Sequence, residues 1–365
     1  MGKPKFTIAI PVHNGERFLA AAIESAVAQS RPADEVLVVD DNSSDATRAI
    51  ATDTKWRGQV RYVFNARATG FADAFNRAAR LAAGEFVAFL SSDDTLDPNF
   101  LSSVESLLLA YPQAKFCYVA SRYIDADGKP LSGCRPNCSS PPRLYDGRTY
   151  LRNYLTGCLN HSEIHRCAGV VVERKLFIEE CPFRKEAGIL ADNDFFIRIA
   201  ARTDVVGISE PLASVRVHKD SISSRMESLS LRVSKDYLYQ VRFLRTHPEC
   251  IAEEDAWLVY SLAFRHLSSL FVEALWRGRP DLYSAGTRIL QDLVAAIGPE
   301  ASRKSIAGTG RALHVISHSR WARHLYGVAV RAAAAARRLK RMSLKTFMPE
   351  QANREHSESP RLWEL

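Results

Sequence analysis

Several features that define other classes of protein are missing from this chain of 365 residues. No uninterrupted apolar run approaches 18 residues, so we expect no membrane-spanning helix. The start of the chain leads directly into Phe6–Val12, a run that predicts a strand rather than a signal peptide. The seven cysteines are an odd number scattered along the chain, which favours reduced thiols and a cytoplasmic location.

The sequence also lacks two phosphate-binding signatures and a complete zinc site. No G-x-G-x-x-G follows the first predicted strand and no G-x-x-x-x-G-K-[ST] occurs anywhere, which argues against dinucleotide oxidoreductases and P-loop proteins. Cys134 and Cys138 lie four apart, but no second Cys/His pair at zinc spacing accompanies them. His161 and His165 would share a helix face, yet no third ligand stands at suitable spacing. Zinc is therefore not expected.

Acidic residues are absent from residues 301–348, which contain 11 Lys and Arg. The formal net charge of the chain is +8, so residues 1–300 are close to neutral. A protein that clamps nucleic acid along its body would carry its positive charge in that body. We therefore expect no nucleic-acid partner.

The N-terminal half does contain an alternation of strand and helix patterns. Short β-rich apolar runs predict strands at Phe6–Val12, Glu35–Val39, Val60–Phe64 and Phe86–Leu90. Helical spacing predicts three helices, Leu19–Val27 with Asn14 as N-cap, Ala72–Ala83, and a third from Asp97 to Leu109. This alternation implies an α/β fold with a doubly wound, mostly parallel sheet flanked by helices.

Polar residues gather where the predicted strands end, in the clusters 13–16, 40–45 and 91–94. Ligands of doubly wound sheets bind at this carboxyl edge. Carboxylates there are costly to desolvate unless a cation or a hydrogen-bond donor meets them. Their oxygens suit Mg²⁺ or Mn²⁺ holding a substrate diphosphate. Helix capping explains any one cluster equally well, but three clusters at strand ends favour a ligand site.

Three motifs in the same order resemble the family 2 glycosyltransferases. They are Pro11-Val-His-Asn-Gly-Glu16, Val38-Val-Asp-Asp-Asn-Ser-Ser-Asp45 and Gly84-Glu-Phe-Val-Ala-Phe-Leu-Ser-Ser-Asp-Asp94, within a resemblance that covers residues 5–225. Members of this family have the GT-A fold and transfer a sugar from a nucleotide diphosphate with inversion at the anomeric carbon. The resemblance therefore implies a GT-A-type domain that binds a nucleotide-sugar donor.

The resemblance also implies roles for residues at the donor. Asp41 would hydrogen-bond the nucleotide base. His13 stands where the family often has Tyr, and its ring would stack on the ligand, donate to it, or pack at the rim. Further residues implied at the donor are Pro11, Asn14, Glu16, Asn65 and Arg67, with Asn76 nearby. Helix capping explains Asn65, Arg67 and Asn76 equally well.

Asp93 matches the metal-binding aspartate of the family's D-x-D motif, and Asp94 follows it. Ser91 stands at the position of the first aspartate, which removes one charge and one acceptor. Arg216 and His218 resemble the family's Arg-x-His segment. Either would meet the diphosphate, and a neutral imidazole at His218 would also reach the metal, although a structural Arg/His pair has the same pattern.

An inverting transfer also needs a general base for the acceptor hydroxyl. The segment Gly188–Ala200 resembles the family's Glu-Asp motif at a helix start, with Asp192 on the catalytic aspartate and Ala191 in place of the Glu. Asp194 is the rival base, but two residues on it points elsewhere on a helix. Without the family register, Asp192 reads as an N-cap.

The remaining chain divides into a transferase domain over 1–227, a helical region over 228–348 and a tail over 349–365 that we expect to be flexible. Residues 129–147 are rich in Pro, Ser and Gly and predict a long loop. Within the helical region, the apolar positions Trp321, Leu325, Val328, Ala332, Ala335, Leu339 and Met342 form one stripe among basic residues. Such a helix suits an anionic membrane surface, and equally a homo-oligomer seam or packing on its own domain.

The sequence therefore predicts a metal-dependent inverting glycosyltransferase that uses Mn²⁺ or Mg²⁺. A nucleotide-sugar, by family habit a UDP-sugar, would donate to a saccharide or lipid-linked acceptor during surface-polysaccharide assembly. We expect it in the cytoplasm, at the inner face of the membrane where the basic helix binds. The departures at Ser91 and Ala191 leave one alternative, a catalytically inactive nucleotide-sugar-binding relative.

Overall fold

The computed structural model describes residues 2–131, 142–160, 167–221, 229–248 and 251–298. The chain divides into two compact units. The first consists of Met1–Met226 with Glu249–Ile251, and the second consists of Glu227–Pro248 with Ala252–Leu365.

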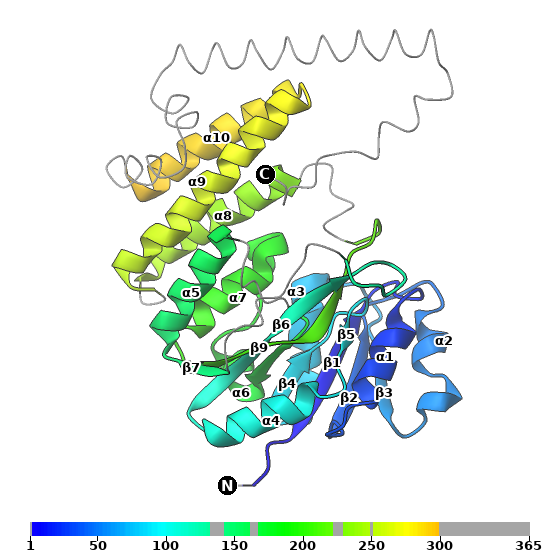
Figure 1. Cartoon of the computed structure of the whole chain (residues 1–365). Helices are drawn as coiled ribbons and strands as arrows, with labels where there is room; N and C mark the ends of the chain where they lie inside the picture. The colour runs from blue at the N-terminus through cyan, green and yellow to red at the C-terminus, as the bar shows by residue number, and fades with distance from the viewer. Residues whose placement is uncertain (1, 132–141, 161–166, 222–228, 249–250, 299–365) are drawn as a thin grey trace, which may run out of the picture. The chain divides into compact units, whose positions relative to one another are not determined.

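The first unit is built around one mixed sheet (Figure 1). Its strand order is β3-β2-β1-β4-β8-β6-β9-β5, and β7 also pairs with β9. β1 to β4 are parallel, whereas β8 runs antiparallel to β4 and β6. The strands are β1 Phe6–Val12, β2 Glu35–Asp40, β3 Val60–Phe64, β4 Phe86–Phe89, β5 Thr95–Leu96, β6 Ala114–Ile124, β7 Arg143–Tyr145, β8 Val170–Glu173 and β9 Asp204–Arg216.

Helices cover both faces of this sheet, so the prediction of a doubly wound, mostly parallel sheet is confirmed. The helices are α1 Leu19–Val27, α2 Thr47–Ala51, α3 Phe71–Leu81, α4 Phe100–Ala110, α5 Gly147–Asn160, α6 Arg174–Glu179 and α7 Ala191–Ile199. Two short 3₁₀ turns, Thr54–Trp56 and Lys185–Leu190, complete the unit.

The four predicted strands are confirmed with ends that move by one residue at most. The prediction that Asn14 caps the first helix was wrong. The helix begins only at Leu19, and Asn14 has a left-handed backbone with φ of 52° and donates its amide proton to Ser43 instead. The loop predicted over 129–147 contains the short strand β7, and its residues 132–141 lie outside the described part.

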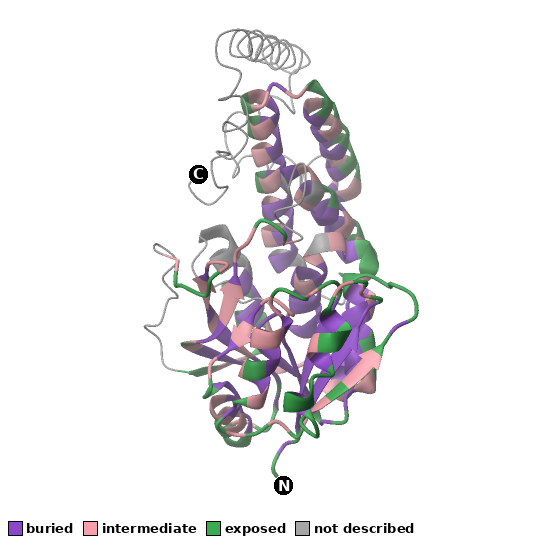
Figure 2. Cartoon of the chain, turned by 90° about the vertical axis from the view of Figure 1, so that its right-hand side faces the viewer, coloured by how far each residue is buried: buried purple, intermediate pink, exposed green. Residues whose placement is uncertain are grey.

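Alternation along the strands divides the core between the two faces of the sheet. Every residue of β1 is buried, as expected of a strand covered on both sides (Figure 2). Ile8 and Ile10 belong to one apolar cluster together with residues of α1 and α4. On β4, Phe89 packs instead in an aromatic cluster with Phe75 of α3 and Phe177 of α6. Parallel strands between two helical layers leave their loops at the carboxyl edge for ligands.

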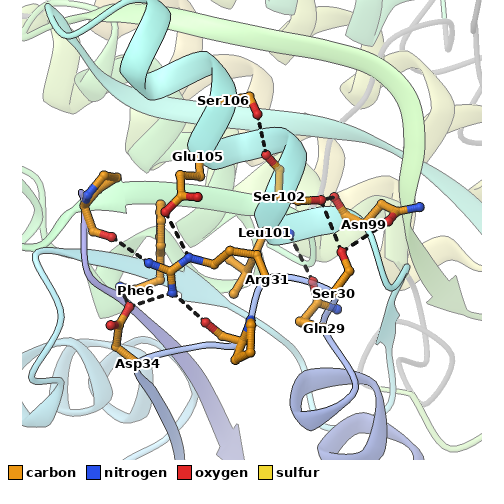
Figure 3. Close-up of polar contacts among 12 residues, drawn as sticks. Phe6, Gln29, Ser30, Arg31, Asp34, Asn99, Leu101, Ser102, Glu105 and Ser106 are labelled. Atoms are coloured by element: carbon orange, nitrogen blue, oxygen red, sulfur yellow. Dashed lines mark hydrogen bonds and ion pairs between the residues drawn. The ribbon is translucent and has the colours of Figure 1, made fainter.

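The other edge of the sheet is closed by structural contacts around Arg31 (Figure 3). The Arg31 guanidinium binds Asp34 at 2.7 Å and Glu105 of α4 at 3.0 Å, and it donates to the Pro4 carbonyl just before β1. It also lies over the ring of Phe6, 4.9 Å from the centroid. These contacts join the connection between α1 and β2 to α4 and have a structural role. The polar clusters of the predicted site lie at the opposite, carboxyl edge of the sheet.

The second unit contains three described helices, α8 Leu229–Thr246, α9 Glu253–Trp276 and α10 Pro280–Ile297. They pack through apolar residues, among them Val241, Phe264, Leu267 and Leu293. Within the described residues, the stretch Asp255–Trp276 is long and apolar enough to cross a membrane, and half of it is buried in the unit. Buried core helices share that composition. The predicted basic helix and the tail lie outside the described residues, as do His161 and His165.

Candidate functional site

The ends of β1, β2 and β4 bring the three predicted polar clusters to the carboxyl edge of the sheet. The loops after β1 and β2 are bound to each other. Asn14 Oδ1 accepts from the Ser44 amide at 2.9 Å, and Glu16 Oε2 accepts from the Ala46 amide at 3.0 Å. These side chains thus organise the edge, and Pro11 lies buried in β1 just before them.

His13 is exposed, and its contacts define its protonation pattern. Its Nδ1 lies 2.8 Å from the Asp41 carbonyl, which can only accept, so Nδ1 carries a proton. Its Nε2 lies 3.2 Å from Nδ2 of Asn14 and accepts from that amide in the neutral ring. The ring is thereby held at the rim of the loop after β2.

Asp41 is buried, and its carboxylate is surrounded by donors from the loop between β3 and α3. It accepts from Asn65 Nδ2 at 3.0 Å, from the Thr69 amide at 2.8 Å and hydroxyl at 2.9 Å, and from the Gly70 amide at 2.9 Å. Burial alone would raise the pKa of Asp41, but the bonds from Asn65, Gly70 and Thr69 outweigh it and lower the pKa below 3.8. Asp41 therefore fastens the start of α3.

Asn65 and Arg67 belong to the same loop but differ in burial. Because Asn65 gives its amide nitrogen to Asp41, its Oδ1 faces the other way, and this buried oxygen has no hydrogen-bond partner in the described part of the chain. An acceptor in that state is costly unless a ligand donates to it. Arg67 is exposed on the same loop and adds a positive charge to this edge.

Asn76 does not reach this edge of the site. Its amide group makes a pair of 2.8 Å hydrogen bonds with the backbone of Phe183, accepting from the amide and donating to the carbonyl. It therefore connects α3 to the segment that leads to α7.

Asp93 and His218 come together although 125 residues separate them in the sequence. His218 Nε2 lies 3.1 Å from Asp93 Oδ2, while Nδ1 of the buried ring has no partner among the described residues. The pair offers one carboxylate oxygen and one imidazole nitrogen. No group of three or more metal-ligating side chains occurs in the described residues. The donor set still fits Mg²⁺ or Mn²⁺, because such ions take one or two protein ligands and complete their shell with phosphates and water.

Arg216 fixes the loop after β4, because its guanidinium is engaged in hydrogen bonds to backbone carbonyls. Its Nε donates to the Asp93 carbonyl at 2.8 Å, and its Nη1 donates to the carbonyls of Asp125 and Ala126. Its backbone amide donates to Asp94 Oδ1 at 2.8 Å. Burial and the neighbouring charge of Asp93 raise the pKa of Asp94 well above 3.8. Ser91 also bonds to the Asp94 carboxyl, so this serine supports the loop where the family has its first aspartate.

Sequence reasoning missed Phe18, at the start of α1. Its ring lies 4.7 Å from the His218 ring, and the guanidinium of Arg216 lies over it at 4.8 Å. Arg17 also covers the ring, at 4.7 Å. Phe18 thus supports both residues of the Arg-x-His segment. No sequence signal marks it, because an aromatic residue beside an amphipathic helix reads as core.

The two candidate bases, Asp192 and Asp194, have different surroundings. Asp192 is half-buried on the first turn of α7, and its Oδ1 accepts from the Asn193 amide at 2.8 Å. Asp194 is buried and pairs with both Arg184 and Arg198. A buried carboxylate whose two oxygens are both occupied by guanidinium groups is not accessible to a substrate hydroxyl, which leaves Asp192 as the candidate. Ala191, at the position of the family's Glu, is fully buried.

Comparison with known sequences gives the family of this domain. Residues 7–177 match the family described as Glycosyl transferase family 2. EpsH of Bacillus subtilis, a putative glycosyltransferase, is 24% identical over 229 residues, which are 62% of this chain and 65% of the relative. TuaG of the same organism, a putative teichuronic acid biosynthesis glycosyltransferase, is 31% identical over 159 residues, 43% of this chain and 61% of TuaG. The chain thus matches less than two thirds of either relative's length.

Solved structures show the same fold. S. aureus TarS 1-349, in complex with UDP-GlcNAc, superposes with a TM-score of 0.65 at 16% identity, covering 92% of both chains. The mannosyltransferase PcManGT of Pyrobaculum calidifontis, in complex with GDP-Man and Mn²⁺, gives 0.51 at 18% identity, covering 92% of this chain and 88% of that one.

The fold is thus the GT-A type that the sequence predicted, followed by a helical region. Within this class, the matched motifs at the ends of β1, β2 and β4 specify the group. Residues 7–177 of the chain form a glycosyl transferase family 2 domain.

Proposed function

We propose that this protein is a metal-dependent inverting glycosyltransferase that moves a sugar from a nucleotide diphosphate to a hydroxyl group of an acceptor. The observation that carries the proposal is the separation of two half-buried aspartates onto different elements. Asp93 follows β4 and stands beside His218, whereas Asp192 stands on the first turn of α7. An in-line displacement needs this division, with charge stabilisation at the leaving group and a base at the attacking one.

The nucleotide would bind between the loops after β1, β2 and β3. Asn65 Oδ1, oriented by Asp41, would accept an N–H of the base, which uracil offers at its imide nitrogen. Pro11, His13, Asn14 and Glu16 would line the same pocket. In the present geometry Asp41 already accepts from three residues, so its contribution to the base runs through the loop that it holds.

Asp93 and His218 would hold the divalent ion, and Arg67 would add positive charge on the diphosphate side. When bound, the ion acts as a Lewis acid that neutralises the charge developing on the leaving diphosphate. Arg216 and Phe18 keep Asp93 and His218 in place, and the buried Asp94 keeps the loop after β4 attached to the end of β9.

Asp192 would take the proton of the acceptor hydroxyl as its oxygen attacks the anomeric carbon from the side opposite the diphosphate. A hydrolase built on two carboxylates would need its second acid at the scissile oxygen. At the leaving side this chain instead offers Asp93 paired with His218, which suits a diphosphate leaving group.

The substrate assignment follows the relatives. TarS binds UDP and UDP-GlcNAc, so a UDP-sugar is the proposed donor. TuaG is named for teichuronic acid biosynthesis, which favours a saccharide or lipid-linked acceptor in surface-polysaccharide assembly. We place the enzyme in the cytoplasm, with the basic segment 301–348 at the anionic inner face of the membrane or in a homo-oligomer. Liposome flotation with and without anionic lipid separates these two roles.

The test combines donor binding with turnover. A thermal-shift screen of nucleotide-sugars with and without Mn²⁺ is expected to show metal-dependent stabilisation by one of them. Asp192→Asn should then abolish transfer of that sugar and leave its binding nearly intact. Full activity in this variant would refute the assignment of the base. Metal-dependent binding without turnover in the wild type would instead identify an inactive nucleotide-sugar-binding relative.

A further inference from the structure

The segment before α7 is fastened at three successive residues. Asn76 of α3 binds the backbone of Phe183 at both its polar atoms. Arg198 of α7 donates to the Pro182 carbonyl at 2.6 Å. Arg184 pairs with Asp194, which lies on α7 two residues after Asp192. Residues 182–184 are thus tied both to α3 and to the helix that carries the proposed base.

Both carboxylate oxygens of Asp194 are occupied by contacts with Arg184 and Arg198. One oxygen accepts from Nη2 of Arg184, and the other accepts from Nε of Arg184 at 3.0 Å and from Arg198 at 2.9 and 3.0 Å. The residue is only 3% exposed. Burying an aspartate and an arginine is costly, and fixing one arrangement of the chain is a role that such buried pairs have in some proteins.

The chain between these ties and α7 does not fix the helix by itself. The 3₁₀ turn Lys185–Leu190 is broken by Gly188, whose backbone has φ of 61° and ψ of −129°. This conformation is open to glycine but strained for other residues. The 3₁₀ turn and α7 are therefore not one continuous helix. Side chains that join the two sides of the kink hold the first turn of α7 against residues 182–184.

We propose that Asp194, together with Arg184, is a positioning residue of the transfer reaction. The pair sets the first turn of α7 against residues 182–184 and so directs the carboxylate of Asp192 at the acceptor hydroxyl. This inference rests on the proposed role of Asp192 as base. It also explains why a second carboxylate stands next to the base, enclosed and withheld from substrate.

The same arrangement links the base to the donor pocket. Helix α3 begins at the loop held by Asp41, where the Gly70 amide meets the carboxylate. One and a half turns further on, Asn76 of the same helix holds Phe183. Residues 182–184 are the common support, because α3 fixes them from the donor side and Asp194 uses them to fix α7.

Two variants and one control test this role. Arg184→Gln removes one of the ties across the kink and keeps the Asp194–Arg198 pair, so Asp194 retains one cationic partner. Asp194→Asn removes both ties. The matched control is Arg202→Gln, because Arg202 follows α7 and joins Glu180, in the same preceding segment, through an exposed pair at 2.9 Å. Each change is made alone and in the Asp192→Asn background.

The assay is hydrolysis of UDP-GlcNAc and UDP-Glc with Mn²⁺, in which water takes the place of the acceptor hydroxyl and UDP is released, alongside calorimetric binding of UDP with Mn²⁺. Arg184→Gln and Asp194→Asn are expected to lower kcat about 10- to 100-fold, because small displacements of a reacting group have effects of that size. Their Kd for UDP should change less than about twofold, since uniform binding is not affected. Arg202→Gln should match the wild type.

The double variants decide whether Asp194 acts through Asp192. If it does, neither change lowers the residual rate of Asp192→Asn any further. Independent, multiplicative losses would overturn the inference. Wild-type kcat in Arg184→Gln, with Asp192→Asn inactive, would overturn it while leaving the proposed function intact. Full activity of Asp192→Asn would overturn the base assignment and this inference together. Hydrogen exchange gives a readout that does not depend on activity: the Asn193 amide should exchange faster in Arg184→Gln than in Arg202→Gln.

Discussion

The loop after β4 and the first turn of α7 each hold a pair of aspartates in place, but they do so through different contacts. Each presents a half-buried aspartate, Asp93 or Asp192, next to a buried one, Asp94 or Asp194. In the loop, Asp94 accepts from the backbone of Arg216, and its raised pKa favours the neutral acid. In the helix, Asp194 is matched by two guanidinium groups. The two elements thus hold the buried carboxyl beside the half-buried aspartate through different partners, a backbone amide in one and an ion pair in the other.

The strongest test of this contrast is the loss of stability when each buried carboxyl becomes an amide. Asp194→Asn leaves two arginine charges without their partner and should cost about 3–5 kcal/mol in the free energy of unfolding. Asp94→Asn keeps the acceptor for the Arg216 amide and should cost less than about 1 kcal/mol. Urea unfolding of both variants measures the difference. Equal losses would mean that Asp94 is held as a charged group too.

In the loop after β4, the rate of sugar transfer should depend much more on the half-buried Asp93 than on the buried Asp94. If Asp93 holds the ion as proposed, Asp93→Asn removes an oxygen ligand and should lower the rate of sugar transfer about 100-fold, as expected for the loss of one group that stabilises the leaving charge. Asp94→Asn should lower it only slightly, because the neutral acid and the amide both satisfy the backbone. The rates are compared at saturating Mn²⁺, and titration of Mn²⁺ should show the weaker apparent affinity only in Asp93→Asn.

Some parts of this site could be predicted from the sequence, and others could not. The strands and the three polar clusters could be predicted because hydrophobic periodicity and strand-end position are local properties. The pairing of Asp93 with His218 required knowing that the end of β9 pairs with β5, which directly follows the loop after β4, since 125 residues separate the two in sequence. The roles of Phe18, Arg184 and Asn76 could not be predicted, because each depends on a neighbour brought close only by the fold.

Asp41 offers a third way to hold a buried carboxylate, through neutral donors only. Since its bonds to Asn65, Gly70 and Thr69 lower the pKa in the folded state, this group adds stability above its unfolded pKa near 3.8. That stability is lost as the pH falls through the lower folded value. Asp41→Asn should cost about 1–2 kcal/mol at pH 7, as for hydrogen bonds to a charged group.

The pH series provides the check on Asp41. The difference in stability between wild type and Asp41→Asn, from urea unfolding, should be constant between pH 5 and 7 and shrink below about pH 4. A difference that grows toward acid would mean that the folded pKa is raised. Asp34, whose pKa is also lowered at the opposite edge of the sheet, is the matched control. Asp34→Asn should show the same pH trend without any change in nucleotide binding.

Phe18 supports the residues around the loop after β4 through its aromatic ring, whereas α7 is supported by an ion pair. Phe18→Leu keeps an apolar side chain at the start of α1 but removes the ring that His218 and Arg216 contact. We expect the binding free energy of UDP with Mn²⁺ to fall by about 0.5–1 kcal/mol, the range of one cation–π contact. This corresponds to binding that is about two- to fivefold weaker. Calorimetry with UDP alone is the control, since binding without the ion should change less. If Phe18→Leu weakens both equally, the ring supports the nucleotide pocket as a whole and not the Asp93–His218 pair.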